Sequence, residues 1–160
     1  MKPNLYFAAP LFSQAELEFN AQVARKLEAY FAVYLPQRDG GLFSELVQRD
    51  HMNVDQASAL IFQKDVEAME LCDILLLVLD GRTVDEGAAF EIGYCYSKGK
   101  VCVGLQTDSR RLLPIGNNPM INGPLINIFT SIDSLLAWAA SYAPLVGSAQ
   151  KYPNVAGSKA

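Results

Sequence analysis

The residues best suited to chemistry lie in segment 79–94, directly after the most apolar run of the chain. Within it, Asp85 precedes a predicted helix, and Glu91 lies near the start of that helix among small and apolar residues. The N-terminal end of a helix carries positive potential, which favours an ionised carboxylate. A carboxylate held in such a place is a candidate nucleophile or general base. Position alone also fits a simpler interpretation, in which Glu91 is an ordinary solvent-exposed helix carboxylate.

Other candidate groups also have simpler interpretations when each is taken alone. Asp65 lies on the preceding predicted helix, beside Lys64, and fits a surface charge. Tyr6 lies in an apolar strand segment and fits the hydrophobic core, while Asp85 fits a helix N-cap. His51 is the single histidine, which disfavours a histidine-based catalytic triad or a metal site with several histidines.

Two common nucleotide-binding patterns are missing from the sequence. No Gly-x-Gly-x-x-Gly follows the first predicted strand, and no Gly-x-x-x-x-Gly-Lys-Ser/Thr occurs in the chain. Both patterns place glycine-rich backbone against phosphate groups at the start of a helix. Their absence removes the main support for a dinucleotide-binding or nucleoside-triphosphate-binding protein.

Alternating strands and helices must position the candidate residues. Short apolar runs predict strands over residues 5–9, 33–35, 73–80, 101–105 and 125–129. Apolar periodicity and capping signals predict helices over residues 13–30, from 53 or 55 to 71, 86–98 and 131–142. Turn-forming residues predict loops over residues 37–41 and 107–123.

This alternation predicts an α/β fold with a doubly wound, five-stranded parallel sheet of flavodoxin-like (Rossmann-like) type, in a single domain. We expect residues 1–145 to form the domain and residues 146–160 to form a mobile C-terminal tail. Such sheets bind ligands beyond the carboxyl ends of their strands, where the winding direction switches. The site is therefore expected at the loops after Ala9, Leu35 and Leu79.

Composition disfavours several classes of protein. The chain has 160 residues, of which 51% are hydrophobic and 19% charged, and this suits one ordered domain. Its net charge of −4 disfavours a nucleic-acid-binding surface. We find neither an apolar run long enough to span a membrane nor a signal-peptide pattern, so we expect a cytoplasmic protein. The three cysteines, Cys72, Cys95 and Cys102, are predicted to be buried free thiols.

Several ordered segments of the chain resemble the nucleoside 2-deoxyribosyltransferase family over about residues 5–136. They are the opening strand and loop at 5–12, the loop at 35–39, Asp65 before Asp73, the segment 85–94, and Asn118-Pro119-Met120. Each segment is a weak signal alone. Their order and spacing together are specific.

The resemblance implies a catalytic role for three residues. Glu91 corresponds to the nucleophile that attacks C1′ of a 2′-deoxyribonucleoside. Tyr6 corresponds to a residue that hydrogen-bonds to that carboxylate, and Asp65 to a group that contacts the base and helps to transfer a proton to it. Together they imply a retaining double displacement through a covalent deoxyribosyl-glutamate.

The resemblance also implies how the substrate is bound. Asp85 is expected on the sugar hydroxyls, Gln37 on an edge of the base and Phe12 against the base. Asn118 and Met120 are expected to reach the site of an adjacent subunit, which implies a homo-oligomer with shared sites. The implied substrates are 2′-deoxyribonucleosides and free purine or pyrimidine bases. No cofactor, metal, nucleic acid or membrane is implied.

Two other functions remain open at this point. One is an N-glycosidase on the same fold that hydrolyses 2′-deoxynucleosides or their 5′-monophosphates. A phosphate would call for serines or basic groups around it, whereas the element at 118–120 favours a free 5′-hydroxyl. The other is a non-catalytic nucleotide-binding module, which would leave Glu91, Asp65 and Asp85 without a shared purpose.

Overall fold

The computed structural model describes residues 1–41, 43–48, 51–110 and 116–149. Its five-stranded sheet is parallel throughout and has the order β2-β1-β3-β4-β5. The strands are β1 (Asn4–Ala8), β2 (Ala32–Tyr34), β3 (Ile74–Val78), β4 (Val101–Leu105) and β5 (Leu125–Phe129). This order is the flavodoxin-like form of a doubly wound sheet, so the predicted fold class is confirmed.

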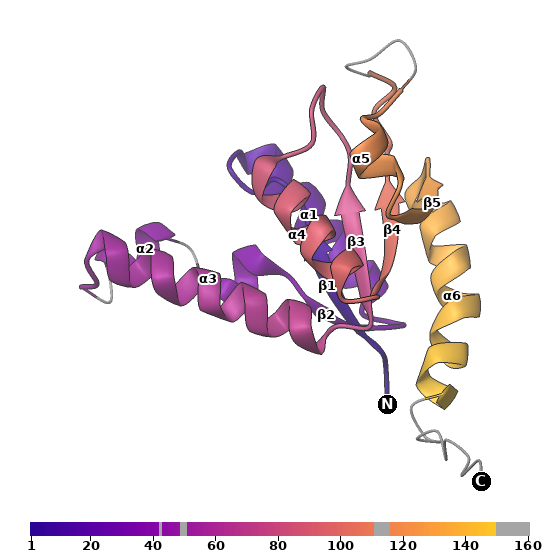
Figure 1. The fold of residues 1–160 in the computed structure, drawn as a ribbon, viewed down its shortest axis with the longest axis horizontal. Helices are drawn as coiled ribbons and strands as arrows, with labels where there is room; N and C mark the ends of the chain where they lie inside the picture. The colour runs from indigo at the N-terminus through magenta and orange to yellow at the C-terminus, as the bar shows by residue number, and fades with distance from the viewer. Residues whose placement is uncertain (42, 49–50, 111–115, 150–160) are drawn as a thin grey trace, which may run out of the picture.

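Helices cover both faces of the sheet (Figure 1). α1 (Gln14–Leu27) and α6 (Ile132–Ala149) share one buried apolar cluster, to which Leu27 and Leu135 belong. α3 (Val54–Leu71) and α4 (Glu86–Ser97) form the other cluster, which includes Tyr6 and Ile92. Every residue of β3 is buried between the two layers. Its continuous apolar sequence is typical of a central parallel strand.

Side-chain caps set the starts of the helices that matter for the site. Ser13 caps α1 in a capping box with Glu16, as the sequence predicts. Asn53, rather than Asp55, caps α3. Asp85 caps α4, and its Oδ2 accepts a hydrogen bond from the backbone N–H of Ala88 at 3.0 Å. These caps fix where α3 and α4 begin, and therefore which of their residues face the sheet.

The segment after β2 differs from the prediction. Residues 37–41 were expected to form a loop, but Pro36–Gly40 form a single π-helical turn, η1. Leu35 anchors this turn, because its backbone N–H donates to Asp39 Oδ2 at 2.8 Å and its carbonyl accepts from the N–H groups of Arg38 and Asp39. A short helix, α2 (Phe43–Gln48), follows, and with α3 it projects from the sheet on the side opposite α6 (Figure 1).

Two further segments also differ from the prediction. The expected loop at 107–123 contains a short helix, α5 (Pro119–Asn122), while residues 111–115 lie outside the described part of the chain. α6 continues to Ala149 instead of ending near Tyr142, with Pro144 inside it. Packing of Ala139 and Ala143 against the core offsets the usual penalty of an internal proline. The rest of the expected tail, residues 150–160, lies outside the described residues.

Two further findings on the described residues concern the expectations drawn from composition. No described helix is long and apolar enough to cross a membrane. Cys72, Cys95 and Cys102 are buried and free, as predicted.

Candidate active site

The register of the sheet places two tyrosines side by side. Tyr6 of β1 is paired with Tyr34 of β2, and paired residues of adjacent parallel strands direct their side chains to the same face. The two rings are stacked, with centroids 5.5 Å apart and an angle of 18° between their planes. This face of the sheet is the one that α3 and α4 cover, so both hydroxyls point toward those two helices.

The Tyr6 hydroxyl meets Glu91 of α4. It donates a hydrogen bond to Glu91 Oε1 at 2.6 Å. Glu91 shares its helix face with Ala88, Ile92 and Cys95, all three of them buried. Burial raises the pKa of Glu91 to about 8; the Tyr6 hydrogen bond opposes this rise, and negative charge nearby adds to it. A solvent-exposed helix carboxylate has none of these features.

The Tyr34 hydroxyl meets the second acidic residue, Asp65 of α3. It donates to Asp65 Oδ1 at 2.9 Å. Burial raises the pKa of Asp65, although the Tyr34 hydrogen bond and the Lys64 ammonium both lower it. The negative charge of Asp65 in turn adds to the raised pKa of Glu91. Two neighbouring carboxyl groups whose pKa values are both raised suit acid–base chemistry.

Gly40, at the end of η1, lies against this second pair. A Cβ atom added to it would be 2.8 Å from Asp65 Oδ1 and 3.2 Å from the Tyr34 hydroxyl. No side chain larger than hydrogen fits there without displacing one of these groups. Sequence reasoning missed both Tyr34 and Gly40. The position of Tyr34 in the predicted strand at 33–35 could have indicated that it lies near Tyr6. The sequence around Gly40 indicated only a turn.

Two neighbouring cavities open onto the carboxyl groups. One of about 270 Å³ lies beyond β1 and β2, at the place that the switch-point rule selects. Its lining includes Phe12 from the loop after β1, Pro36 from η1, and Asp65, Asp85 and Glu91. The other, of about 380 Å³, lies between α3 and α4 and shares Asp65 and Glu91 with the first. Their sizes are near the lower end of small-molecule pockets, which span about 300–1,000 Å³.

Two of the predicted substrate-binding residues line the first cavity. Asp85 does so while its Oδ2 caps α4, which leaves Oδ1 for another partner. Both interpretations of Asp85, as a cap and as a site residue, are therefore compatible with its position. Phe12 also lines the cavity, and it is 79% exposed, so its ring borders the opening rather than the core.

Gln37 is placed differently from the expectation that it reads a base edge. Its Nε2 donates to the carbonyl of Leu17 at 2.8 Å, and its Oε1 accepts from Asn20 Nδ2 at 3.1 Å. Asn20 also donates to the carbonyl of Pro10 at 2.8 Å. Gln37 is absent from the lining of both cavities. In this arrangement its amide ties η1 and the loop after β1 to α1, so it shapes the cavity without facing it.

Met120 lies on α5 and Asn118 directly before it, and neither lines these two cavities. Asn118 caps the helix, and its Oδ1 accepts from the Met120 backbone N–H at 2.9 Å. Both side chains are exposed, Met120 to 80%. Their expected role in the site of an adjacent subunit stays a prediction.

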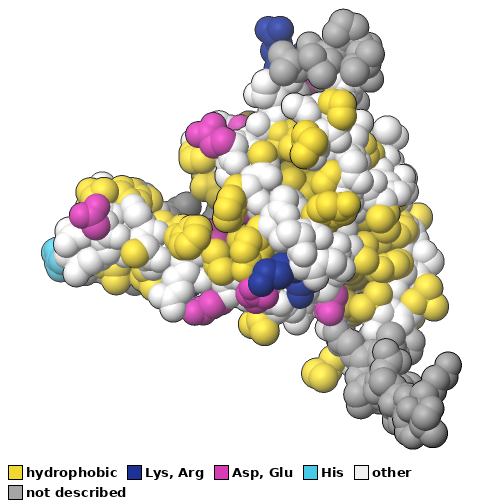
Figure 2. Space-filling view, in the orientation of Figure 1, with side chains coloured by type: hydrophobic (Ala, Val, Ile, Leu, Met, Phe, Trp, Pro, Cys, Tyr) yellow, Lys and Arg dark blue, Asp and Glu magenta, His cyan; other side chains and the backbone are white. Residues whose placement is uncertain are grey.

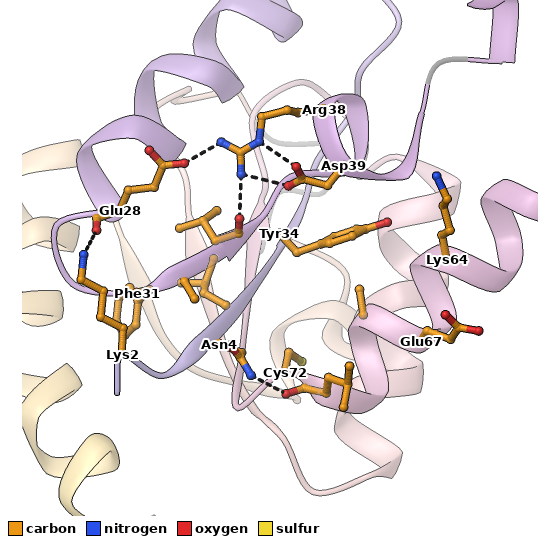
Figure 3. A pocket seen from close by; sticks show the side chains of 15 residues that line it. Lys2, Asn4, Glu28, Phe31, Tyr34, Arg38, Asp39, Lys64, Glu67 and Cys72 are labelled. Carbon is orange, nitrogen blue, oxygen red and sulfur yellow. Dashed lines mark hydrogen bonds and ion pairs between the residues drawn. The ribbon is translucent and has the colours of Figure 1, made fainter. Parts of the chain in front are cut away.

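A larger cavity of about 800 Å³ lies along the edge strand β2, behind Tyr34 (Figure 3). Its charged groups are largely engaged with each other, since Arg38 pairs with Glu28 and Asp39 and also donates to the carbonyl of Val33. Figure 3 shows Tyr34 reaching past this cavity toward α3. The cavity contains no counterpart of the paired carboxyl groups, so we place the candidate active site in the two smaller cavities. Among the described residues, no cluster suited to a metal ion is found.

Comparisons with known proteins identify the family of the chain. The chain matches the model of the nucleoside 2-deoxyribosyltransferase family over residues 5–147. A conserved protein from Enterococcus faecalis V583 is 30% identical, with a TM-score of 0.70 over 88% of this chain and 99% of that one. An uncharacterized protein of Ureaplasma parvum serovar 3 is 27% identical over 58% of this chain, and the match spans 59% of that protein, less than two thirds of its length.

Two solved structures with lower identity share the fold. A 2-deoxyribosyltransferase from Bacillus psychrosaccharolyticus is 22% identical, with a TM-score of 0.63 over 83% of this chain and 90% of that one. A CMP N-glycosidase from Clostridium botulinum is 18% identical, with a TM-score of 0.52 over 87% of this chain and 98% of that one. At these identities the likeness concerns the fold alone.

Proposed function

Because the chain belongs to the nucleoside 2-deoxyribosyltransferase family, we propose that it transfers the 2-deoxyribosyl group from one nucleobase to another. The observation that carries this proposal is the 2.6 Å hydrogen bond between Tyr6 and the partly buried Glu91, beside Asp65 and Asp85 in one cavity. A carboxylate that is held by one oxygen and open to a cavity by the other suits nucleophilic attack on a sugar carbon.

In the first half-reaction, the ionised form of Glu91 attacks C1′ of a bound 2′-deoxyribonucleoside. Tyr6 holds Oε1, so Oε2 forms the new ester bond while the bond from C1′ to the base nitrogen breaks. Because burial raises the pKa of Glu91 to about 8, ionisation of Glu91 has to be favoured as the attack proceeds. The positive charge that develops on the sugar and the Tyr6 hydroxyl both favour the ionised form at the moment of attack.

The departing base needs a proton, because a nucleobase anion is a poor leaving group. Asp65 lies in the same cavity, and its raised pKa favours the protonated form that can donate. We assign it the role of general acid in the first half-reaction. In the second half-reaction it accepts a proton from the incoming base, which attacks C1′ and releases Glu91. Two displacements on opposite faces retain the configuration at C1′.

The remaining predicted residues bind substrate in this proposal. Asp85 offers Oδ1 to a deoxyribose hydroxyl, and Phe12 packs against the base at the opening of the cavity. Gln37 fixes the position of the loops around the base through its hydrogen bonds to Leu17 and Asn20. For its amide to contact an edge of the base, these two hydrogen bonds would have to break and be replaced by hydrogen bonds to the base.

Self-association completes the proposed site through Asn118 and Met120 of a second copy. Exposed aromatic side chains lie beside the second cavity: Phe62 is 61% exposed and Phe90 is 52% exposed, with their rings 6.3 Å apart. Figure 2 shows hydrophobic side chains gathered over the region where α3 and α4 meet. An apolar surface of this kind supports contact with another protein surface.

The same chemistry with water as acceptor would make the protein a hydrolase. One relative of this fold is a CMP N-glycosidase, which favours keeping this second candidate. The two functions differ only in what attacks the ester of Glu91, so they are separated by product analysis.

The test is to incubate the protein with 2′-deoxyinosine plus adenine, and then with 2′-deoxyinosine alone. Transfer predicts 2′-deoxyadenosine in the first reaction and little free deoxyribose in the second. Hydrolysis predicts free deoxyribose in both. Glu91→Ala should abolish either reaction, while Glu86→Gln, at an exposed carboxylate in the first turn of the same helix, should retain it.

A further inference from the structure

Two tyrosine–carboxyl pairs stand next to each other in the site. Tyr6 and Tyr34 are register partners, and each hydroxyl donates to one carboxyl group on a different helix. The first pair holds the proposed nucleophile, Glu91. The second pair holds the proposed general acid, Asp65, but its tyrosine, Tyr34, has no role in the mechanism described so far.

We propose that Tyr34 is the positioning residue of the general acid: by donating to Asp65 Oδ1, it assigns the transferable proton to Oδ2 and directs that oxygen to the base. The proposal rests on the proposed function. It adds one residue, Tyr34, and one proton-carrying atom, Asp65 Oδ2, to the proposed mechanism. A carboxyl oxygen that already accepts a strong hydrogen bond is the poorer place for the acidic proton, so the proton resides on the other oxygen.

The surroundings of the pair restrict how Asp65 can turn. Gly40 leaves only the space of a hydrogen atom beside Asp65 Oδ1 and the Tyr34 hydroxyl. The ring of Tyr34 is held by its stacking on Tyr6, which is fully buried. Asp65 therefore meets a fixed donor on one side and the cavities on the other.

The hydrogen bond also tunes the acid. After Asp65 has given its proton to the base, the Tyr34 hydroxyl stabilises the carboxylate that remains. Without this hydroxyl, Asp65 becomes a weaker acid and its proton is free to sit on either oxygen. Both effects slow only those reactions in which the base must be protonated as it leaves.

Leaving-group dependence follows from this argument. A 2′-deoxyadenosine donor needs a proton on its base. A 2′-deoxyguanosine donor methylated on its imidazole ring already carries a positive charge, so its base leaves without help from an acid. A residue that only supports the fold would affect both donors equally.

The experiment compares wild type, Tyr34→Phe and a matched control, Tyr30→Phe, with both donors and one fixed acceptor. Tyr30 is also partly buried, but it packs on the opposite face of the sheet. Tyr34→Phe should lower kcat/KM on 2′-deoxyadenosine by about 10–100-fold, the effect of losing a hydrogen bond to a charged group. It should change kcat/KM on the methylated donor by less than about threefold. Tyr30→Phe should leave both donors within about threefold of wild type.

Equal loss on both donors, or no loss on either, would overturn the role of Tyr34. If Tyr34→Phe does not fold, as judged by circular dichroism, Gly40→Ala carries the same test, because its Cβ would lie 2.8 Å from Asp65 Oδ1 and 3.2 Å from the Tyr34 hydroxyl and would disturb the hydrogen bond between them. The activity of wild type distinguishes failure of the proposed function from failure of the inference on Tyr34. If wild type cleaves neither donor, the proposed function fails and the inference fails with it; if wild type is active and the variants show no donor dependence, the inference fails alone.

Discussion

The hydrogen bond from Tyr6 to Glu91 predicts a specific change in pH dependence when the hydroxyl is removed. In Tyr6→Phe, burial and the negative charges of Asp65 and Asp85 still raise the pKa of Glu91, and the one group that lowers it is lost. The pKa of Glu91 should therefore rise above its value of about 8 in the wild type.

The size of the change follows from the energy of the bond. A hydrogen bond to a charged partner contributes about 1.5–3 kcal/mol, and one pH unit corresponds to about 1.4 kcal/mol. The pKa of Glu91 should rise by about one to two pH units. Because the ionised form is the nucleophile, the rise of kcat/KM with pH should move to higher pH by the same amount. At pH 7 the loss is then about 10–100-fold, and it shrinks as pH increases.

The assay is kcat/KM for 2′-deoxyribosyl transfer by wild type and Tyr6→Phe, measured from about pH 5 to about pH 10, with Tyr30→Phe as a control. Circular dichroism at each pH confirms that the proteins are folded. A loss that is uniform across this pH range would mean that Tyr6 acts through packing alone. A movement of the profile to lower pH would refute the assigned direction of the hydrogen bond's effect.

Three further predictions test the ionised carboxylate, the core and the assembly. Glu91→Gln should raise Tm relative to wild type, and the difference in Tm should grow between pH 4.5 and about pH 8. The reason is that the pKa of Glu91 is raised in the folded state, so ionisation of Glu91 destabilises the folded state over this pH range. A difference in Tm that is independent of pH would contradict this prediction. Gly104→Ala should lower the free energy of unfolding, measured in urea, by about 1–3 kcal/mol, because its Cβ would lie 2.8 Å from a side-chain atom of Leu79. Gly93→Ala is the control: it has open space around it, so the free energy of unfolding should stay the same or rise by up to about 1 kcal/mol. Glu91→Ala and Asn118→Ala should each be strongly impaired, and subunit exchange between them should restore activity to about one quarter of the sites; no recovery despite exchange seen by native mass spectrometry would exclude Asn118 from a neighbour's site.

Local sequence patterns predicted the parts of this structure that depend on near neighbours. The apolar run of β3, the Ser13 capping box and the Asp85 cap each follow from residues within one or two helical turns. The strand order is the usual one for alternating strands and helices of this number. The switch-point rule selects the region where the cavity of the candidate site lies.

Contacts between distant segments were not predictable in the same way. Tyr34 meets Asp65 because of the register between β1 and β2 and the path of α3, and no local pattern encodes either. The orientation of the Gln37 amide depends on Asn20, on a different element. Pro144 suggested the end of a helix, but packing of the alanines before it outweighed this local signal.

The central claim is that Glu91 forms a covalent ester with the sugar. Intact-mass spectrometry of the wild type with a slow donor analogue should show the addition of one 2-deoxyribosyl group, and peptide mapping should place it on Glu91. Glu91→Ala should show no addition, and Glu86→Gln should show the same addition as wild type. An adduct on another residue, or turnover of the donor by wild type with no adduct under conditions that trap such an ester, would contradict the account.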